Sequence, residues 1–204
     1  MKSVSIWIVE YFQGSVELGY YAVGVNLSML LMVLPSTIRE VFIPYIASSD
    51  REENLKNLTF FSRVGFTLIL LIATVIFLLS DHLIPFLYGA EFTSSIVPFK
   101  YLLAAIAMTS IGIIFSAYNY GTGSPKLNFY ANVVSLVMIL VLDFWLIPKY
   151  GITGAAIATL ITYTFNSALI FFTVIFNQKL PIKNYFFVSW EDIKKLRKFK
   201  RGNT

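Results

Sequence analysis

The side chains that could do chemistry in this sequence stand within or beside long apolar stretches. Arg39 and Glu40 follow an uncharged run from Leu18 to Ile38, and Asp143 is the one charge between Leu127 and Pro148. A charge at membrane depth costs at least ~2.5 kcal/mol and by default marks a functional site. We expect Arg39 to contact an anionic substrate, with snorkelling or packing as the alternative. Glu40 and Asp143 are candidates for charge screening or ion coupling, and Asp143 lies near enough to the predicted outer surface to be hydrated there instead.

Polar and small residues recur at helical spacing in three further apolar stretches. The stripes are Ala105, Thr109, Gly112, Ser116 and Asn119; Asn128, Asn132, Ser135 and Asp143; and Ala155, Thr159, Thr162 and Asn166. Steps of three and four place each set on one helix face. Such faces either pack helices closely or line a cavity, and the sequence leaves both open. We take Asn119, Asn132 and Asn166 as candidate substrate-binding residues, whereas Gly154 and Ala158 predict packing.

Motifs of enzymes and metal sites are missing from the sequence. It contains no cysteine and one histidine, His82, which excludes thiolate and multi-histidine metal sites. We find no HExxH, no GxSxG, no P-loop and no glycine-rich dinucleotide turn. The sequence therefore predicts no enzyme, no metal and no cofactor.

The composition of the sequence indicates that these residues lie in membrane-spanning helices. Of the 204 residues 57% are hydrophobic and 13% are charged, about half the charged fraction of a soluble domain, and the mean hydropathy is +0.72. In lipid every backbone polar group must bond internally, and continuous apolar runs favour helices over a barrel. The predicted fold is all-α, an integral membrane bundle with five full transmembrane helices and a partial one near the N-terminus. The full helices are expected at 18–47, 59–80, 98–120, 127–147 and 152–176.

Two features of these helices follow from proline and glycine. Pro35 and Pro44 predict a kink in the first full helix. Pro148 and Gly151 enclose a four-residue hinge between two apolar runs, where Lys149 and Tyr150 suit a membrane interface. We expect two antiparallel membrane helices to meet at this hinge.

Lysine and arginine predict the orientation. The 81–97 connection has neither, whereas residues 177–204 form a basic tail carrying Lys179, Lys183, Lys194, Lys195, Arg197, Lys198, Lys200 and Arg201. The positive-inside rule then predicts a cytoplasmic tail and an outer 81–97 segment in a multi-pass protein of the cell membrane. The run KKLRKFKR at 194–201 is either a topology anchor or a patch for anionic lipid headgroups. Nucleic-acid binding is not expected, because the charge follows membrane topology.

Three segments carry a family resemblance. The stretches GYYAVGVNLSMLLMVLPSTIREVFIPYIA (19–47), FLYGAEFTSSIVPFKYLL (86–103) and LDFWLIPKYGITGAAIATLITY (142–163) resemble the C-terminal half of polysaccharide flippases, which belong to the multidrug and lipid-linked precursor exporter superfamily. The resemblance implies two bundles of about six helices with substrate between them. It also implies movement of lipid-linked oligosaccharide across the cytoplasmic membrane by alternating access, with the polar stripes lining the cavity for sugars.

Within that resemblance, residues 1–176 correspond to the C-terminal transmembrane bundle. An N-terminal bundle is expected as a partner, in the same or a separate chain, because one bundle hardly encloses a cavity. A contact between Arg39 and the lipid pyrophosphate is an inference from charge and position. Membrane lipids are the other expected partners.

Two alternatives to the flippase remain open. A cation-coupled small-molecule exporter of the same superfamily would need a membrane-embedded carboxylate, for which Glu40 is the best candidate. A scaffold or accessory subunit would tolerate loss of Arg39. A membrane glycosyltransferase is disfavoured, because it would need a sizeable extramembrane loop with catalytic carboxylates.

Overall fold

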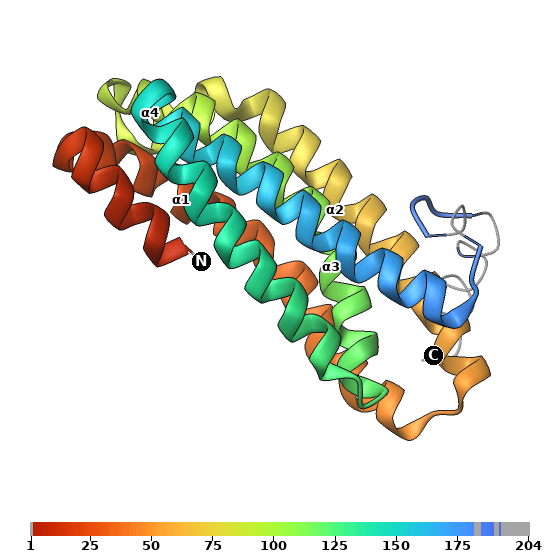
Figure 1. The fold of residues 1–204 in the computed structure, drawn as a ribbon. Coiled ribbons are helices and arrows are strands. Elements are labelled where there is room, and N and C mark those ends of the chain that lie inside the picture. Colours follow the sequence, from red (N-terminus) through yellow and green to blue (C-terminus); the bar gives the residue numbers. More distant parts are fainter. Residues whose placement is uncertain (1, 182–184, 190–191, 193–204) are drawn as a thin grey trace.

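The computed structural model describes residues 2–181, 185–189 and 192. Its elements are α1 (Lys2–Ser48), α2 (Arg51–Tyr88), a short 3-10 helix η1 (Ala90–Ser95), α3 (Ile96–Gly121) and α4 (Pro125–Gln178) (Figure 1). The described residues contain no strand, so the prediction of an all-helical fold is confirmed.

Four helices of the described chain are long and apolar enough to cross a membrane, as expected of a multi-pass membrane protein. The predicted count of five full helices and a partial one is not matched. The reason lies in two glycines. Helices α1 and α4 each continue up to a single residue with non-helical dihedrals, Gly14 in α1 and Gly151 in α4, and resume directly after it. In α4, for example, the predicted helices 127–147 and 152–176 left a connection of four residues, whereas the helix is interrupted at Gly151 alone.

Helix α4 folds back on itself at Gly151. The glycine has φ 57° and ψ −141°, a combination that L residues with a Cβ rarely adopt. A straight helix of 54 residues would be about 80 Å long, far more than the ~30 Å hydrocarbon core. Figure 1 shows the first half of α4 (green to teal) and the second half (blue) running side by side. At their junction a Cβ on Gly154 would lie 2.3 Å from the Leu146 carbonyl oxygen, so close packing there requires glycine.

Helix α1 is also interrupted at a glycine near its N-terminal end. Gly14 has φ 81° and separates a short N-terminal helix from the longer one that follows. Gln13 Nε2 donates to the Ile147 carbonyl oxygen at 3.3 Å, which ties this short helix to the end of the first half of α4. Pro35 and Pro44 both lie inside α1, and the non-helical dihedrals in this helix are those of Gly14. The kink predicted at the two prolines stays a prediction.

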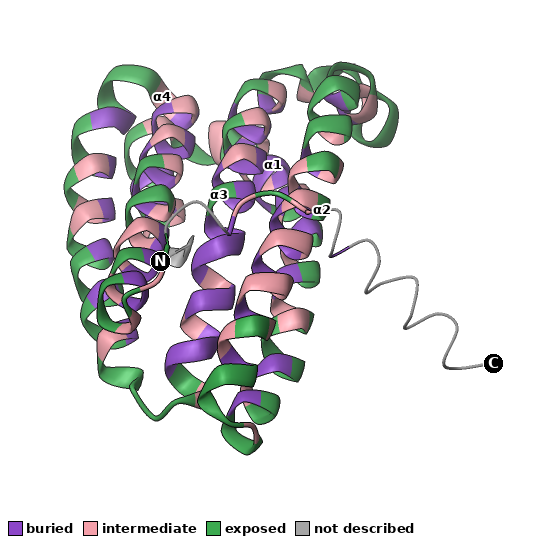
Figure 2. Cartoon of the chain, turned by 90° about the vertical axis from the view of Figure 1, so that its right-hand side faces the viewer, coloured by how far each residue is buried: buried purple, intermediate pink, exposed green. Residues whose placement is uncertain are grey.

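Helix α3 is the central element of the bundle. It packs against α1, α2 and α4, and Figure 2 shows it buried along most of its length. Small residues permit this contact, since a Cβ on Gly112 would lie 2.5 Å from Ser167 Oγ of α4. By contrast, α2 and the first half of α4 expose many large apolar side chains, among them Leu71, Leu78, Val137 and Phe144. These exposed faces fit contact with lipid tails.

The bundle has two distinct ends. At one end the α1–α2 corner meets the end of α4, where Arg51 Nε donates to Gln178 Oε1 at 3.2 Å. The turn between α3 and α4 closes this same end, since Thr122 and Gln178 line one cavity. At the other end Tyr20 of α1 stacks edge-on against Phe92 of η1, with ring centroids 5.6 Å apart.

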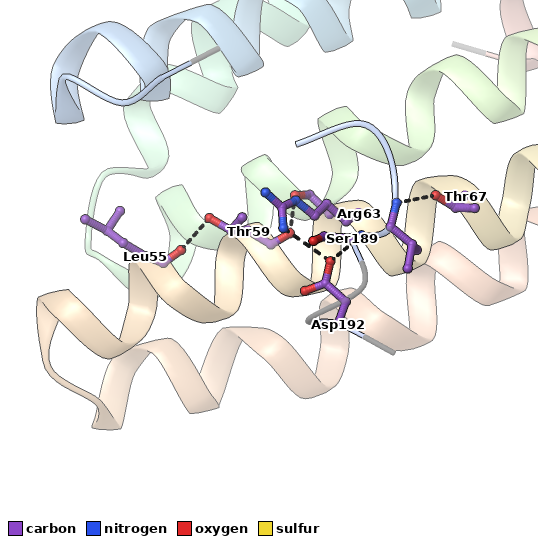
Figure 3. A network of polar contacts seen from close by, with 8 residues as sticks. Leu55, Thr59, Arg63, Thr67, Ser189 and Asp192 are labelled. Atoms are coloured by element: carbon purple, nitrogen blue, oxygen red, sulfur yellow. Dashed lines mark hydrogen bonds and ion pairs between the residues drawn. The ribbon is translucent and has the colours of Figure 1, made fainter. Parts of the chain in front are cut away.

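Residues after α4 return to the bundle surface. Tyr185 is 2% exposed and packs with Phe115 and Phe171, and burial raises the pKa of its phenol above the ordinary value. Asp192 Oδ2 accepts from Arg63 Nη1 at 3.2 Å and from the Ser189 backbone N–H at 2.8 Å, as Figure 3 shows. These contacts hold residues 185–189 and Asp192 against the bundle. The basic run at 194–201 lies outside the described residues.

Candidate functional site

A polar cavity of about 210 Å³ lies between α1, α3 and α4. Arg39 reaches it from α1, and Asn132 and Asn166 reach it from the two halves of α4. The sequence proposed all three as substrate-binding residues, and the fold brings them together. The rest of the lining is Met32, Thr109, Gly112, Ile113, Ser116, Tyr120, Tyr163 and Ile170. Thr109, Gly112 and Ser116 belong to the polar stripe of α3, so that stripe faces the cavity for three of its positions.

Among the described residues that line this cavity, Arg39 is the only charged one. Its guanidinium carbon lies 5.8 Å from the centre of the Tyr120 ring, within cation–π range. The residue is exposed, and the described part of the chain offers it no ion-pair partner. A guanidinium with five donors and no carboxylate beside it is suited to bind a phosphate or carboxylate group.

The amide of Asn166 joins the two halves of α4. Its Nδ2 donates to Ser135 Oγ at 2.8 Å, and Asn132 Oδ1 and the Ala131 carbonyl oxygen each lie 3.2 Å away. Asn132 is exposed at the cavity, whereas Ser135 is fully buried. The polar stripes of α4 therefore do both things that the sequence left open: they pack the helices and they line a cavity.

Two aromatic residues of the lining were missed by the sequence reasoning. Tyr120 follows Ser116 by four residues, and Tyr163 precedes Asn166 by three. Both lie in helical register with residues of the stripes, so including aromatic residues three or four positions from stripe residues would have found them. Aromatic rings at a polar cavity offer flat surfaces for the apolar faces of sugar rings and donors for their hydroxyls.

Asn119 lies elsewhere. It is 3% exposed, and its Nδ2 donates to Asn128 Oδ1 at 2.9 Å, while Asn128 Nδ2 donates to the Ser116 carbonyl oxygen at 3.0 Å. The amide of Asn119 is thus used to join α3 to the start of α4, and it is not among the cavity residues.

Glu40 is exposed and is not part of the cavity lining. Adjacent helical residues diverge by about 100°, and among the described contacts Glu40 forms no ion pair with Arg39. No ion pair among the described residues therefore supports the proposed screening of Arg39 by Glu40.

Asp143 is fully buried, with 0% of its surface exposed, so hydration at the outer surface does not account for it. Ser5 Oγ donates to Asp143 Oδ2 at 2.6 Å, whereas Asp143 Oδ1 has no hydrogen-bond partner among the described residues. A second cavity, of about 30 Å³, lies beside this pair and is lined in part by Ser5, Tyr21 and Thr159. A volume of that size is enough for about one small occupant such as a water molecule.

Neither cavity has the geometry of a reaction centre. The larger one offers a cation, amides and phenols, which are groups that bind and orient anions and hydroxyls. The described residues that line it include no carboxylate, histidine or thiol to serve as a base or nucleophile. The arrangement can hold a polar anionic ligand.

Comparison with known proteins gives consistent matches. Residues 1–97 match a family model described as polysaccharide biosynthesis protein. Over 170 residues the chain is 24% identical to the probable low-salt glycan biosynthesis flippase Agl15 of Haloferax volcanii, and over 169 residues it is 27% identical to the probable flippase AglR of that organism. Over 159 residues it is 22% identical to the capsular polysaccharide biosynthesis protein CapF of Staphylococcus aureus. The resemblance to polysaccharide flippases is confirmed.

These relatives are longer than the chain. The matches cover 81%, 79% and 76% of this chain but 36%, 35% and 40% of Agl15, AglR and CapF. The chain therefore spans well under half the length of each of these relatives. No solved structure matches it.

Proposed function

We propose that the chain is the C-terminal bundle of a flippase that moves lipid-linked oligosaccharide or polysaccharide repeat units across the cytoplasmic membrane. The observation that carries this proposal is the cavity in which Arg39 faces amides and phenols without an ion-pair partner among the described residues. The names of the relatives, two flippases and a capsular polysaccharide biosynthesis protein, point to the same substrate class.

In this proposal different residues of the cavity bind the phosphate and the sugar parts of the substrate. Arg39 binds the charged phosphate linkage between lipid and glycan, because its guanidinium matches phosphate geometry. Asn132 and Asn166 bind sugar hydroxyls through their amides, and Tyr120 and Tyr163 stack on sugar rings. Each of these sugar contacts recognises a hydroxyl or a ring face, which all sugars share. The cavity can therefore accept glycans of different composition.

Alternating access requires a second wall for the cavity. We propose an N-terminal bundle, in the same or a separate chain, that closes over α1, α3 and α4 and rocks against them. Counting the fold-back at Gly151 as a hairpin gives five membrane crossings after the short helix that ends at Gly14. The end with Arg51, Lys126 and the tail then faces the cytoplasm, by the positive-inside rule.

Ion coupling is a second candidate property, favoured by Asp143. A fully buried carboxylate with one unpartnered oxygen among the described contacts is costly unless a proton or cation joins it during the cycle. The same observation supports the cation-coupled exporter as the alternative function. Glu40 remains a candidate for screening or coupling only as an exposed residue outside the cavity lining.

The test is polysaccharide export in cells whose only flippase is the intact protein. We expect Arg39→Ala to abolish export and Arg39→Lys to retain part of it, because lysine keeps the charge without the bidentate geometry. Lys126→Ala, which removes an exposed cation outside the cavity, is the matched control and leaves export unchanged. Normal export by Arg39→Ala at equal expression would reject the proposal in favour of a scaffold.

A further inference from the structure

A third cavity, of about 550 Å³, opens at the end of the bundle where α1 turns into α2. Helix α1 contributes the apolar Ile46 to its lining. The polar lining residues come from α2, α3, α4 and the connections beside them: Ser49, Arg51, Asn54, Tyr118, Thr122, Asn177 and Gln178. Tyr118 lies on the face of α3 that turns away from Tyr120, and Thr122 directly follows the helix. The two cavities share no lining residue, so this cavity is separate from the one around Arg39. It therefore stands independently of the proposed transport function.

The acids near this cavity are already engaged. Asp50 caps α2, its carboxylate accepting from the Glu53 backbone N–H at 2.9 Å. Glu52 pairs with Lys56 at 2.7 Å, and Glu53 accepts a hydrogen bond from the Tyr45 hydroxyl. None of these three carboxylates lines the cavity.

Arg51 is the one charged side chain that the described part of the chain places in the lining. Its Nε donates to Gln178 Oε1 at 3.2 Å, and no described residue forms an ion pair with it. The terminal nitrogens of its guanidinium remain for a ligand. This gives the cavity a positive character at its wall.

Asn54 supplies the complementary group. It is 4% exposed, and its Nδ2 donates to the Ile46 and Ser49 carbonyl oxygens at 2.9 and 3.2 Å. These two bonds fix the amide, so that its Oδ1 is a buried acceptor with no partner in the described chain. A buried acceptor without a donor costs about 1–3 kcal/mol, which a ligand hydroxyl or ammonium group would recover.

We propose that this cavity binds a phosphate ester of a small polar alcohol, with the phosphate on Arg51 and a hydroxyl or ammonium donor on Asn54 Oδ1. Residues at i and i+3 of a helix lie on the same face, with Cβ atoms about 5–6 Å apart, so one small ligand can contact both Arg51 and Asn54. Both phospholipid headgroups and free glycerol phosphate carry this chemistry. Occupation would link the α1–α2 corner to the ends of α3 and α4.

The experiment uses the intact protein, purified in detergent and freed of lipid. Binding of short-chain phosphatidylglycerol, of glycerol 3-phosphate and of inorganic phosphate is measured by native mass spectrometry and calorimetry. We expect glycerol phosphate chemistry to bind more tightly than inorganic phosphate, because only the former has a donor for Asn54. Arg51→Gln should weaken binding about tenfold or more.

Lys56→Gln is the matched control, since it removes an equal charge from an exposed position on the same helix outside the cavity. It should change binding less than twofold. Retention of phosphatidylglycerol without competition from glycerol 3-phosphate assigns the site to a membrane headgroup, and full competition assigns it to a soluble phosphate ester. Equal losses in the two variants, or no binding of any probe, would overturn the site.

Discussion

Asn166 and Ser135 stand 31 positions apart in the sequence, yet Asn166 Nδ2 donates to Ser135 Oγ at 2.8 Å across the two halves of α4. This bond, with the neighbouring contacts to Asn132 and Ala131, pins the fold-back of α4 far from its turn. We predict that Asn166→Ala lowers stability by about 1 kcal/mol, since interhelical hydrogen bonds in membranes contribute ~0.6 kcal/mol each on average. Thermal unfolding in detergent measures this. Thr164→Ala, at an exposed position on the same helix, is the control, and equal midpoints would show that the bond adds nothing.

Gly151 makes the fold-back possible. Its φ of 57° with ψ of −141° is strained for a residue with a Cβ, so Gly151→Ala should destabilise the protein by about 1–3 kcal/mol and reduce its folded yield. Gly19→Ala is the matched control, because a Cβ there meets no atom within 4 Å and its backbone is helical. Size-exclusion profiles and unfolding midpoints compare the two. If both variants behave alike, the turn does not depend on glycine.

Replacing Asp143 tests whether transport is coupled to an ion. Asp143→Asn keeps the shape of the side chain and an oxygen for the Ser5 hydroxyl, so the protein should remain folded. If Asp143 couples transport to an ion, this variant loses the dependence of transport on the ion gradient. Flux measured with and without an imposed gradient distinguishes the cases. Unaltered gradient dependence would assign Asp143 a packing role.

The two ends of the bundle predict opposite labelling. Ser94 in η1 and Ser124 before α4 are both exposed, and the sequence contains no cysteine to interfere. Ser94→Cys should react with a membrane-impermeant maleimide in intact cells, and Ser124→Cys only after permeabilisation. The reverse pattern would invert the proposed orientation, and labelling of both from one side would contradict the number of crossings.

Much of the fold could be predicted because uncharged runs of sufficient length have few alternatives to a membrane helix. The element boundaries could not, since Gly14 and Gly151 each allow the chain to turn within one residue and leave no polar loop to mark the place. Proline was a weaker guide: Pro35, Pro44 and Pro148 all lie within continuous helix.

The site was predicted in part for a related reason. Spacing showed that Asn132 and Asn166 lie on polar faces, and charge singled out Arg39. Spacing alone does not distinguish a face that meets a cavity from one that meets another helix, and Asn119 meets Asn128. The same ambiguity left hydration at the outer surface open for Asp143, whereas the short helix before Gly14 covers it with Ser5.

The central claim is that Arg39 binds the charged linkage of a lipid-linked glycan. The most direct measurement is the affinity of the intact protein in nanodiscs for a lipid-linked diphosphate sugar, compared between the wild type and Arg39→Ala. We predict a loss of about tenfold or more, as for removal of one charge-assisted contact, with Lys126→Ala unchanged. Equal affinity of the wild type and Arg39→Ala would contradict the account.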